Sequence, residues 1–330
     1  MSNGWRRLMR RVLTPNVSET LLDTRGFNRK SPAATETLET VGAMFLEGYG
    51  TAVETRTPAE LAARLDEIPT RYRGFAYEGA GMGYGVLDAL PIPGKDRNDT
   101  FLATTGDPHI YMVYVGVGWA MARTPRFTWP KFDRYDTLLR WLILDGYGFH
   151  QTYFHTRKYA HEQYVDPNFG WPGKQASPAI AAYANRAIDQ GIGRAMWFVA
   201  GTDPDELAKL FVPFAEHRKT DLWAGAGLAA TYAGGGDADE LRRLVDHAGE
   251  YVGALAQGSA FAAEARVRAD LVVPHNELAT RIICGLSVEQ AARITLDVKP
   301  ENPVDGELPA FELWRQRIAT EVMNLGGVGK

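Results

Sequence analysis

DPDEL at residues 203–207 and DADEL at residues 237–241 are nearly the same five residues, 34 positions apart. In both, an aspartate stands three residues before a glutamate, a spacing in which the two side chains cap the first turn of a helix. TPAE at 57–60 and SVEQ at 287–290 follow the same pattern, and Ser177-Pro178 offers the cap without the acid. These segments predict the starts of amphipathic helices that recur along the chain.

A second motif, a glycine followed two positions later by a small residue, occurs six times. Its first glycines are Gly79, Gly116, Gly146, Gly191, Gly225 and Gly258. A glycine inside a helix costs about 1 kcal/mol relative to alanine, so its repetition indicates helices that pack too closely for larger side chains. We therefore expect an all-α fold, an α/α barrel (toroid) of about six helix pairs with glycine-rich inner helices and capped outer helices. An open solenoid of the same pairs is the alternative.

Within this fold we expect an N-terminal helical extension over residues 1–50, the barrel over residues 51–297, and a C-terminal tail over residues 298–330. The tail contains a final helix near residues 311–323. We expect loops at residues 90–99 and 159–178, where glycine and proline interrupt the helical pattern.

Composition narrows the class of protein. The chain of 330 residues has a net charge of −4 and one cysteine, which argues against nucleic acid as a partner and against a disulfide framework. No apolar run has the length of a membrane span and no export signal is evident, so we expect a cytoplasmic protein. Residues 5–13 form a basic amphipathic stretch. We favour a terminal helix that packs on its own domain; the alternative is peripheral contact with the inner face of a membrane.

The residues that precede the first glycines are the best candidates for chemistry, because a buried neutral carboxylic acid can act as a general acid. Asp145 is the first candidate, since it lies in an apolar stretch whose only nearby basic residue is His150, which could orient or reprotonate it. Glu78 is the second candidate. Asp107 is the third, although capping of the helix over residues 111–121 is the favoured role for it. The alternative for all three is a structural role that ties helices together.

Other types of site find little support. The histidines at 150, 155 and 161 miss the spacing of a metal site on one helical face, and no phosphate-binding loop is present. We expect no metal and no cofactor, with a magnesium ion that assists head-group binding as the alternative. Aromatic side chains are abundant and could stabilise a cation in a cavity.

Six segments carry a resemblance to a known family: residues 73–90, 109–123, 138–155, 186–199, 221–235 and 255–266. Together they resemble an uncharacterised-domain family whose members are labelled enediyne biosynthesis proteins. That family is similar to single-domain bacterial class II terpene cyclases of meroterpenoid and sesterterpenoid pathways. The resemblance implies an α/α barrel and a proton-initiated cyclisation of a polyprenyl substrate.

The leading hypothesis is therefore a class II terpene cyclase. The residues expected to bind its hydrophobic substrate are Tyr77, Trp119, Tyr147, His150, Gln190, Trp197, Trp223 and Phe261. The alternative is a non-catalytic helical-repeat scaffold or an accessory protein of an enediyne pathway. A closed ring around an apolar cavity favours the cyclase, and an open groove favours the scaffold.

Overall fold

The computed structural model describes residues 3–174 and 177–326, and within these residues it contains helices and no strand. The all-α prediction is confirmed. The α-helices are α1 (Asn3–Leu13), α2 (Leu22–Arg25), α3 (Pro32–Glu54), α4 (Pro58–Leu65), α5 (Thr70–Ala89), α6 (Arg97–Leu102), α7 (Ile110–Arg123), α8 (Trp141–Phe154), α9 (Pro178–Ala182), α10 (Ala184–Val199), α11 (Pro204–Phe211), α12 (Glu216–Tyr232), α13 (Ala238–Ala248), α14 (Val252–Arg268), α15 (Pro274–Ile283), α16 (Val288–Asp297) and α17 (Ala310–Gly326).

The predicted helix starts are confirmed in position and in chemistry. The side chains of Thr57, Ser177, Asp203, Asp237 and Ser287 each accept a hydrogen bond from a backbone N–H in the first turn of the helix that follows. Two of the starts, at Asp237 and Ser287, form complete capping boxes in which the third helical residue bonds back to the cap. These bonds satisfy N–H groups that a helix cannot satisfy internally.

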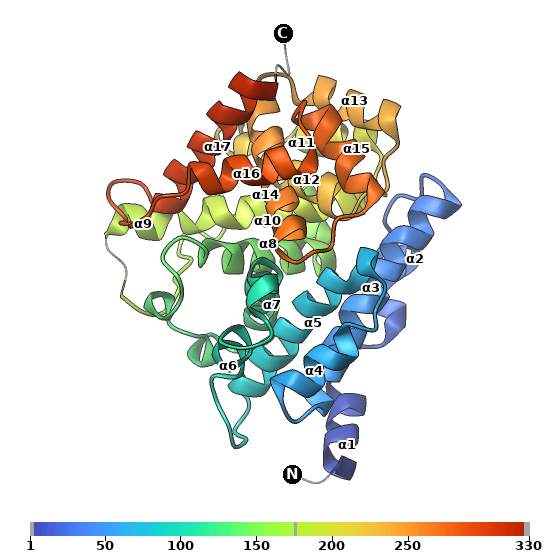
Figure 1. Cartoon of the computed structure of the whole chain (residues 1–330), viewed down its shortest axis with the longest axis vertical. Coiled ribbons are helices and arrows are strands. Elements are labelled where there is room, and N and C mark those ends of the chain that lie inside the picture. The colour runs from blue at the N-terminus through green and yellow to red at the C-terminus, as the bar shows by residue number, and fades with distance from the viewer. Residues whose placement is uncertain (1–2, 175–176, 327–330) are drawn as a thin grey trace.

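Seven long helices pack side by side in chain order and form the centre of the molecule (Figure 1). They are α3, α5, α7, α8, α10, α12 and α14, and each makes close contact with the next. We call them the central array. The capped helices α4, α11 and α13 connect its members. The helix α15 follows the last member and packs on α13, which also packs on α11. The predicted alternation of a glycine-rich helix with a capped helix is present in these parts of the chain.

Glycine pairs set the distance between neighbouring helices of the central array. In α7, a Cβ added at Gly116 would lie 2.0 Å from the carbonyl oxygen of Glu78 on the preceding helix. One added at Gly118 would lie 1.8 Å from the carbonyl oxygen of Ile143 on the following helix. Successive residues of a helix are about 100° apart, so glycines two positions apart face opposite sides. Each glycine pair therefore lets one helix touch two neighbours at once.

The same register repeats along the array. A first glycine packs on the carbonyl of the residue just before the first glycine of the preceding helix, as Gly146 does on Val115 and Gly191 on Asp145. The two end helices carry half of the motif. In α3 only the glycine that faces forward is present, Gly48, which packs on the Ala76 carbonyl. In α14 only the glycine that faces backward is present, and Ala260 takes the second position.

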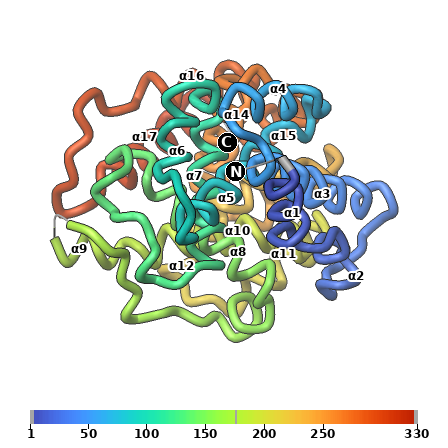
Figure 2. The backbone as a smooth tube through the Cα atoms, turned by 90° about the horizontal axis from the view of Figure 1, so that it is seen from below, coloured from blue at the N-terminus to red at the C-terminus, as the bar shows by residue number. Residues whose placement is uncertain are grey.

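Some connections differ from the expected pairs of helices. Residues 124–140, between α7 and α8, and residues 155–174, after α8, are mainly irregular apart from short helical turns. Prolines such as Pro125 and Pro167 interrupt longer helices there. The loop expected over residues 90–99 ends at residue 96, and α6 begins at Arg97. Of the loop expected over residues 159–178, residues 175 and 176 lie outside the described part. Figure 2 shows that the chain before α9 and before α17 runs along the periphery.

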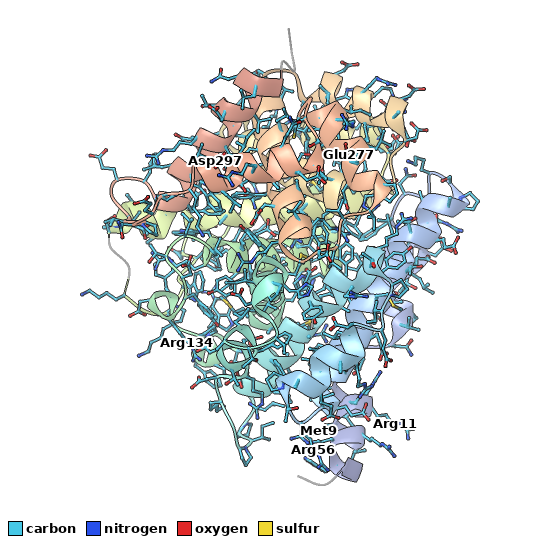
Figure 3. All side chains as sticks on the ribbon, in the orientation of Figure 1. Met9, Arg11, Arg56, Arg134, Glu277 and Asp297 are labelled. Atoms are coloured by element: carbon cyan, nitrogen blue, oxygen red, sulfur yellow. The ribbon has the colours of Figure 1, made fainter. Side chains whose placement is uncertain are left out.

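The two ends of the described chain lie at opposite ends of the molecule (Figure 1). At one end, α1 packs on α3 through Met9, which is buried, and through Arg10, which pairs with Glu47 and Glu54. Figure 3 shows Met9, Arg11 and Arg56 together at this end. Residues 5–13 therefore form a helix that packs on its own domain, as the favoured interpretation predicted. Within the described residues, no helix has the length and apolar character that crossing a membrane requires.

At the other end, α17 packs on α14 and confirms the predicted C-terminal helix. Arg315 anchors it. Its guanidinium lies 2.7 Å from an oxygen of Asp221 on α12 and donates a hydrogen bond of 3.0 Å to Gln257 on α14. These charges are buried together, so they satisfy one another as they tie three helices into one unit.

Candidate functional site

A narrow cavity of about 60 Å³ lies among the first six helices of the central array. This space is smaller than that of small-molecule pockets, about 300 to 1,000 Å³, so the walls must move apart to admit a ligand of that size. Most of its wall is apolar, and the aromatic residues that line it are Phe45, Phe75, Trp119, Phe149, Tyr153, Phe154, Phe198 and Tyr232. The segment between α1 and α2 covers part of it with Pro15, Glu19 and Thr20. We call this cavity the central pocket.

The glycine register determines which side chains reach the central pocket. Positions three residues after the first glycines of α5, α7, α8, α10 and α12 all line it; they are Met82, Trp119, Phe149, Arg194 and Leu228. Positions seven residues after the first glycine line it in four of these helices, with Arg123, Tyr153, Phe198 and Tyr232. These positions lie one and two helical turns beyond the glycine on one face. The pocket is thus a direct consequence of the repeat.

Two carboxyl groups, Glu19 and Glu78, line this pocket, and Glu78 is the buried one. Its side chain is 3% exposed, and burial raises its pKa from 4.5 to about 7. Arg194 opposes this rise from 3.8 Å away, Asp145 reinforces it by repulsion, and Trp119 opposes it weakly. The indole N–H of Trp119 has no other hydrogen-bond partner among the described residues. Glu78 is therefore a carboxylic acid that is partly protonated near neutral pH and faces an apolar space.

Asp145, the first candidate of the sequence analysis, lies behind this wall. It is 1% exposed, and one of its oxygens lies 2.8 Å from an Nη of Arg194 while the other accepts a hydrogen bond of 2.9 Å from Gln190. The expectation that His150 is its only nearby basic residue is wrong, because Arg194 reaches it from α10. Burial raises the pKa of Asp145 too, and Arg194 is the strongest opposing influence. Asp145 does not line the central pocket.

His150 and Asp107 also take other roles than expected. His150 packs against Trp119 and Phe154, both of which line the pocket, and neither ring nitrogen has a hydrogen-bond partner among the described residues. Burial lowers its pKa to about 3, so the ring is neutral and does not hold Asp145. Asp107 is exposed and forms an ion pair of 2.9 Å with Arg268. It does not cap α7, whose N-cap is His109.

Of the eight residues expected to contact a substrate, Trp119 alone lines the central pocket. Tyr77 stacks on His109 and donates a hydrogen bond to Asp66, while Trp223 packs against Phe211 of α11. The rings of His150 and Phe261 pack against Trp119 and Trp314, respectively. Gln190 donates a hydrogen bond to Asp145, and Trp197 donates one to the backbone carbonyl of Gly234. Tyr147 lines a smaller pocket together with Tyr159. The predicted residues lie near the glycines, whereas the side chains on the inner helices that line the pocket recur three and seven positions after the first glycines.

Arg194 is a candidate site residue that was not predicted from the sequence. It stands three residues after Gly191, where the neighbouring helices carry methionine, aromatic or leucine side chains. Its side chain is 6% exposed, lies over the ring of Phe149 at 4.6 Å, and connects the charges of Glu78 and Asp145. A basic residue at an otherwise apolar position of the repeat was the signal that could have identified it.

A metal site finds no further support. Within residues 3–174 and 177–326, no three His, Cys, Asp or Glu side chains gather as ligands for a metal ion. The pocket holds one buried carboxyl group beside one buried guanidinium, surrounded by aromatic rings. This arrangement can donate a proton to an apolar ligand, stabilise the carboxylate that remains, and stabilise a positive charge on the ligand.

The fold and the pocket define an all-helical repeat protein with a buried acid in an apolar, aromatic pocket. The chain belongs to the family of proteins of unknown function termed DUF1702, whose model matches residues 4–322. No curated protein and no solved structure matches the chain.

Proposed function

We propose that this protein is a class II terpene cyclase, which starts the cyclisation of a polyprenyl substrate by protonating it in the central pocket. The observation that carries this proposal is Glu78, a buried carboxyl group with a pKa near 7 on the wall of an aromatic cavity. A general acid works best when its pKa lies near the working pH.

The chemistry requires few groups. The Glu78 carboxyl donates its proton to one carbon of a terminal alkene, which leaves a carbocation on the other carbon and a carboxylate on Glu78. The next double bond of the chain attacks that cation and forms a ring. Loss of a proton to water, or addition of water, ends the sequence. Arg194 stabilises the carboxylate, and rings such as Trp119 and Phe149 stabilise the cation by about 0.5 to 2 kcal/mol each.

We also propose that the central array closes into an α/α toroid around the pocket. Contacts between helices near the two ends of the array support closure. The ring of Tyr232 on α12 packs edge-on against Phe75 on α5 at 5.2 Å. Arg266 on α14 donates hydrogen bonds to the backbone carbonyls of Thr70 and Arg71 at the start of α5. The resemblance of the glycine segments to enediyne biosynthesis proteins and single-domain class II cyclases points the same way.

A non-catalytic role is the second candidate: the protein would hold a lipophilic small molecule as an accessory of a biosynthetic pathway. The narrow, apolar shape of the pocket favours it, since such a pocket binds an apolar ligand without any chemistry. The raised pKa of Glu78 is then a side effect of burial.

One experiment separates the two candidates. The purified protein is incubated with prenyl substrates of different lengths in D2O, and the products are identified by mass spectrometry and NMR. A cyclase gives cyclic products that carry one deuterium from solvent at the protonated carbon. Product formation should fall as the pH rises above about 7, because Glu78 loses its proton there. Glu78→Gln should abolish turnover; recovery of unchanged substrate with the wild-type protein would favour the binding role.

We further propose that the protein acts in the cytoplasm and that α1 makes peripheral contact with an anionic membrane. Leu8 and Val12 are 49% and 70% exposed on this helix, and Arg7 and Arg11 are exposed beside them. Apolar and basic side chains on one exposed helix suit a lipid surface. Sedimentation with phosphatidylserine vesicles tests this: Leu8→Gln together with Val12→Gln should reduce binding. Equal sedimentation of the variant and the wild type would refute the contact.

A further inference from the structure

Arg123 stands at the exposed end of the central pocket. It is the last residue of α7, it lines the pocket, and its side chain reaches solvent. Among the described residues it forms no ion pair and no hydrogen bond, although most arginines near the pocket are paired. Its guanidinium lies 6.0 Å from the ring of Phe154, which also lines the pocket. An unpaired guanidinium at the mouth of an apolar pocket is available to a ligand.

A second arginine, Arg25, lies beside Arg123. Arg25 lies over the same Phe154 ring, at 5.2 Å, and is paired with Glu19, which also lines the pocket. The charges of Arg25 and Glu19 offset each other, so the net charge of the three groups is that of Arg123. Guanidinium groups bind carboxylates and phosphates through two parallel N–H donors. The mouth therefore suits an anionic group, whereas the rest of the wall suits hydrocarbon.

The helix register gives the depth of the pocket. The backbone of Glu78 lies level with Gly116, whose Cα packs on the Glu78 carbonyl. Arg123 stands seven residues further along α7, which corresponds to about 10 Å along the helix axis. A ligand held at Arg123 thus extends on the order of 10 Å into the pocket before it meets the acid.

We propose that Arg123 binds the anionic head group, a carboxylate or a phosphate, of an amphiphilic ligand whose hydrocarbon tail fills the pocket and reaches Glu78. The claim that the tail reacts at Glu78 rests on the proposed function. The claim that Arg123 binds the head group rests on the pocket alone. It narrows the substrate class to prenyl chains with an acidic head group and places the first protonation at the tail, remote from the head.

The test is a binding measurement that requires no turnover. Farnesol, farnesoic acid, farnesyl monophosphate and farnesyl diphosphate share one tail and differ in the head group. Each is titrated against the full-length protein with neutral phenylnaphthylamine in the pocket, and its displacement gives the affinity. We expect the anionic ligands to bind more tightly than farnesol, and added salt to weaken them alone, because salt screens an exposed ion pair.

Variants locate the effect. Arg123→Gln should weaken the anionic ligands by about fivefold while the affinity for farnesol stays the same. Arg123→Lys should keep most of the preference, since it keeps the charge. Arg317→Gln is the matched control, because Arg317 is also exposed and lies on α17, which does not line the pocket. The order of farnesoic acid and the two phosphates then shows which head group the site accepts.

Two results would overturn the inference. The first leaves the proposed cyclase standing, and the second refutes it as well. If farnesol and the anionic ligands bind equally and Arg123→Gln changes nothing, the head-group site is refuted while the apolar pocket and the proposed cyclase remain. If none of the four displaces the probe, the pocket does not take prenyl chains, and both proposals fail. Tight binding of the anions without any turnover would leave this inference standing and count against the cyclase alone.

Discussion

Replacement of Glu78 by glutamine should stabilise the protein above neutral pH. Glutamine has nearly the same shape as protonated glutamic acid but cannot ionise. The pKa of Glu78 rises from 4.5 to about 7 on folding, chiefly through burial. That rise corresponds to roughly 3 kcal/mol by which the folded state disfavours the carboxylate. The wild-type protein bears this cost at every pH at which the carboxylate forms; Glu78→Gln does not.

The sign of the effect follows from the order in which the two states lose the proton. Below about pH 4.5 Glu78 is protonated in both states, and the substitution should change the free energy of unfolding little. Between about 4.5 and 7 the unfolded chain releases the proton first, so the wild-type protein loses stability relative to the variant. Above about pH 7 the difference should level off near 3 kcal/mol in favour of Glu78→Gln.

Urea unfolding curves at a series of pH values measure this difference. Glu67→Gln is the control, because Glu67 is exposed; its curves should follow those of the wild type. If the stability of Glu78→Gln ran parallel to that of the wild-type protein from acid to alkaline pH, Glu78 would not be a desolvated acid. The reasoning that makes it the proton donor would then fail.

Two further predictions concern the helices that hold this acid. Asp145→Asn should leave Glu78 as the nearest carboxyl group to Arg194, at 3.8 Å. It should also move the pH dependence caused by Glu78 to lower pH, since the repulsion from Asp145 is removed; an unchanged profile would contradict this. Gly118→Ala should cost at least about 2 kcal/mol, because the new Cβ meets the next helix. Gly306→Ala, where nothing lies within 4 Å, should stay within about 0.5 kcal/mol in the same melts.

The features that the sequence predicted best depend on neighbours along the chain. A cap such as Asp237 with Glu240 satisfies its own first turn, and no distant residue is needed to form it. The crowding of the glycine-rich helices was predictable for the same reason, since the cost of each glycine is local. The irregular connections were less predictable. Prolines such as Pro125 and Pro130 disfavour a helix but do not determine which other backbone conformation the segment adopts.

The site depends instead on contacts between distant residues. Arg194 lies 2.8 Å from Asp145 on another helix, and nothing in the apolar stretch around Asp145 indicates that partner. The choice between Asp145 and Glu78 turns on which of the two lines the pocket, and both precede a first glycine in the sequence. Side-chain direction in three dimensions separates them, and a single sequence contains that information only through the register of the repeat.

The register also explains why an acid and a guanidinium meet in an otherwise apolar interior. Each first glycine brings its helix against the backbone of the residue that precedes the neighbouring first glycine, so the residues at that position form one layer. The residues three positions after the glycines form the next layer, one helical turn away. Glu78 belongs to the first layer and Arg194 to the second, and they lie 3.8 Å apart where the layers adjoin. The contacts that hold the helices together therefore also set the distance between the two charges, and a change in helix spacing should alter the pKa of Glu78.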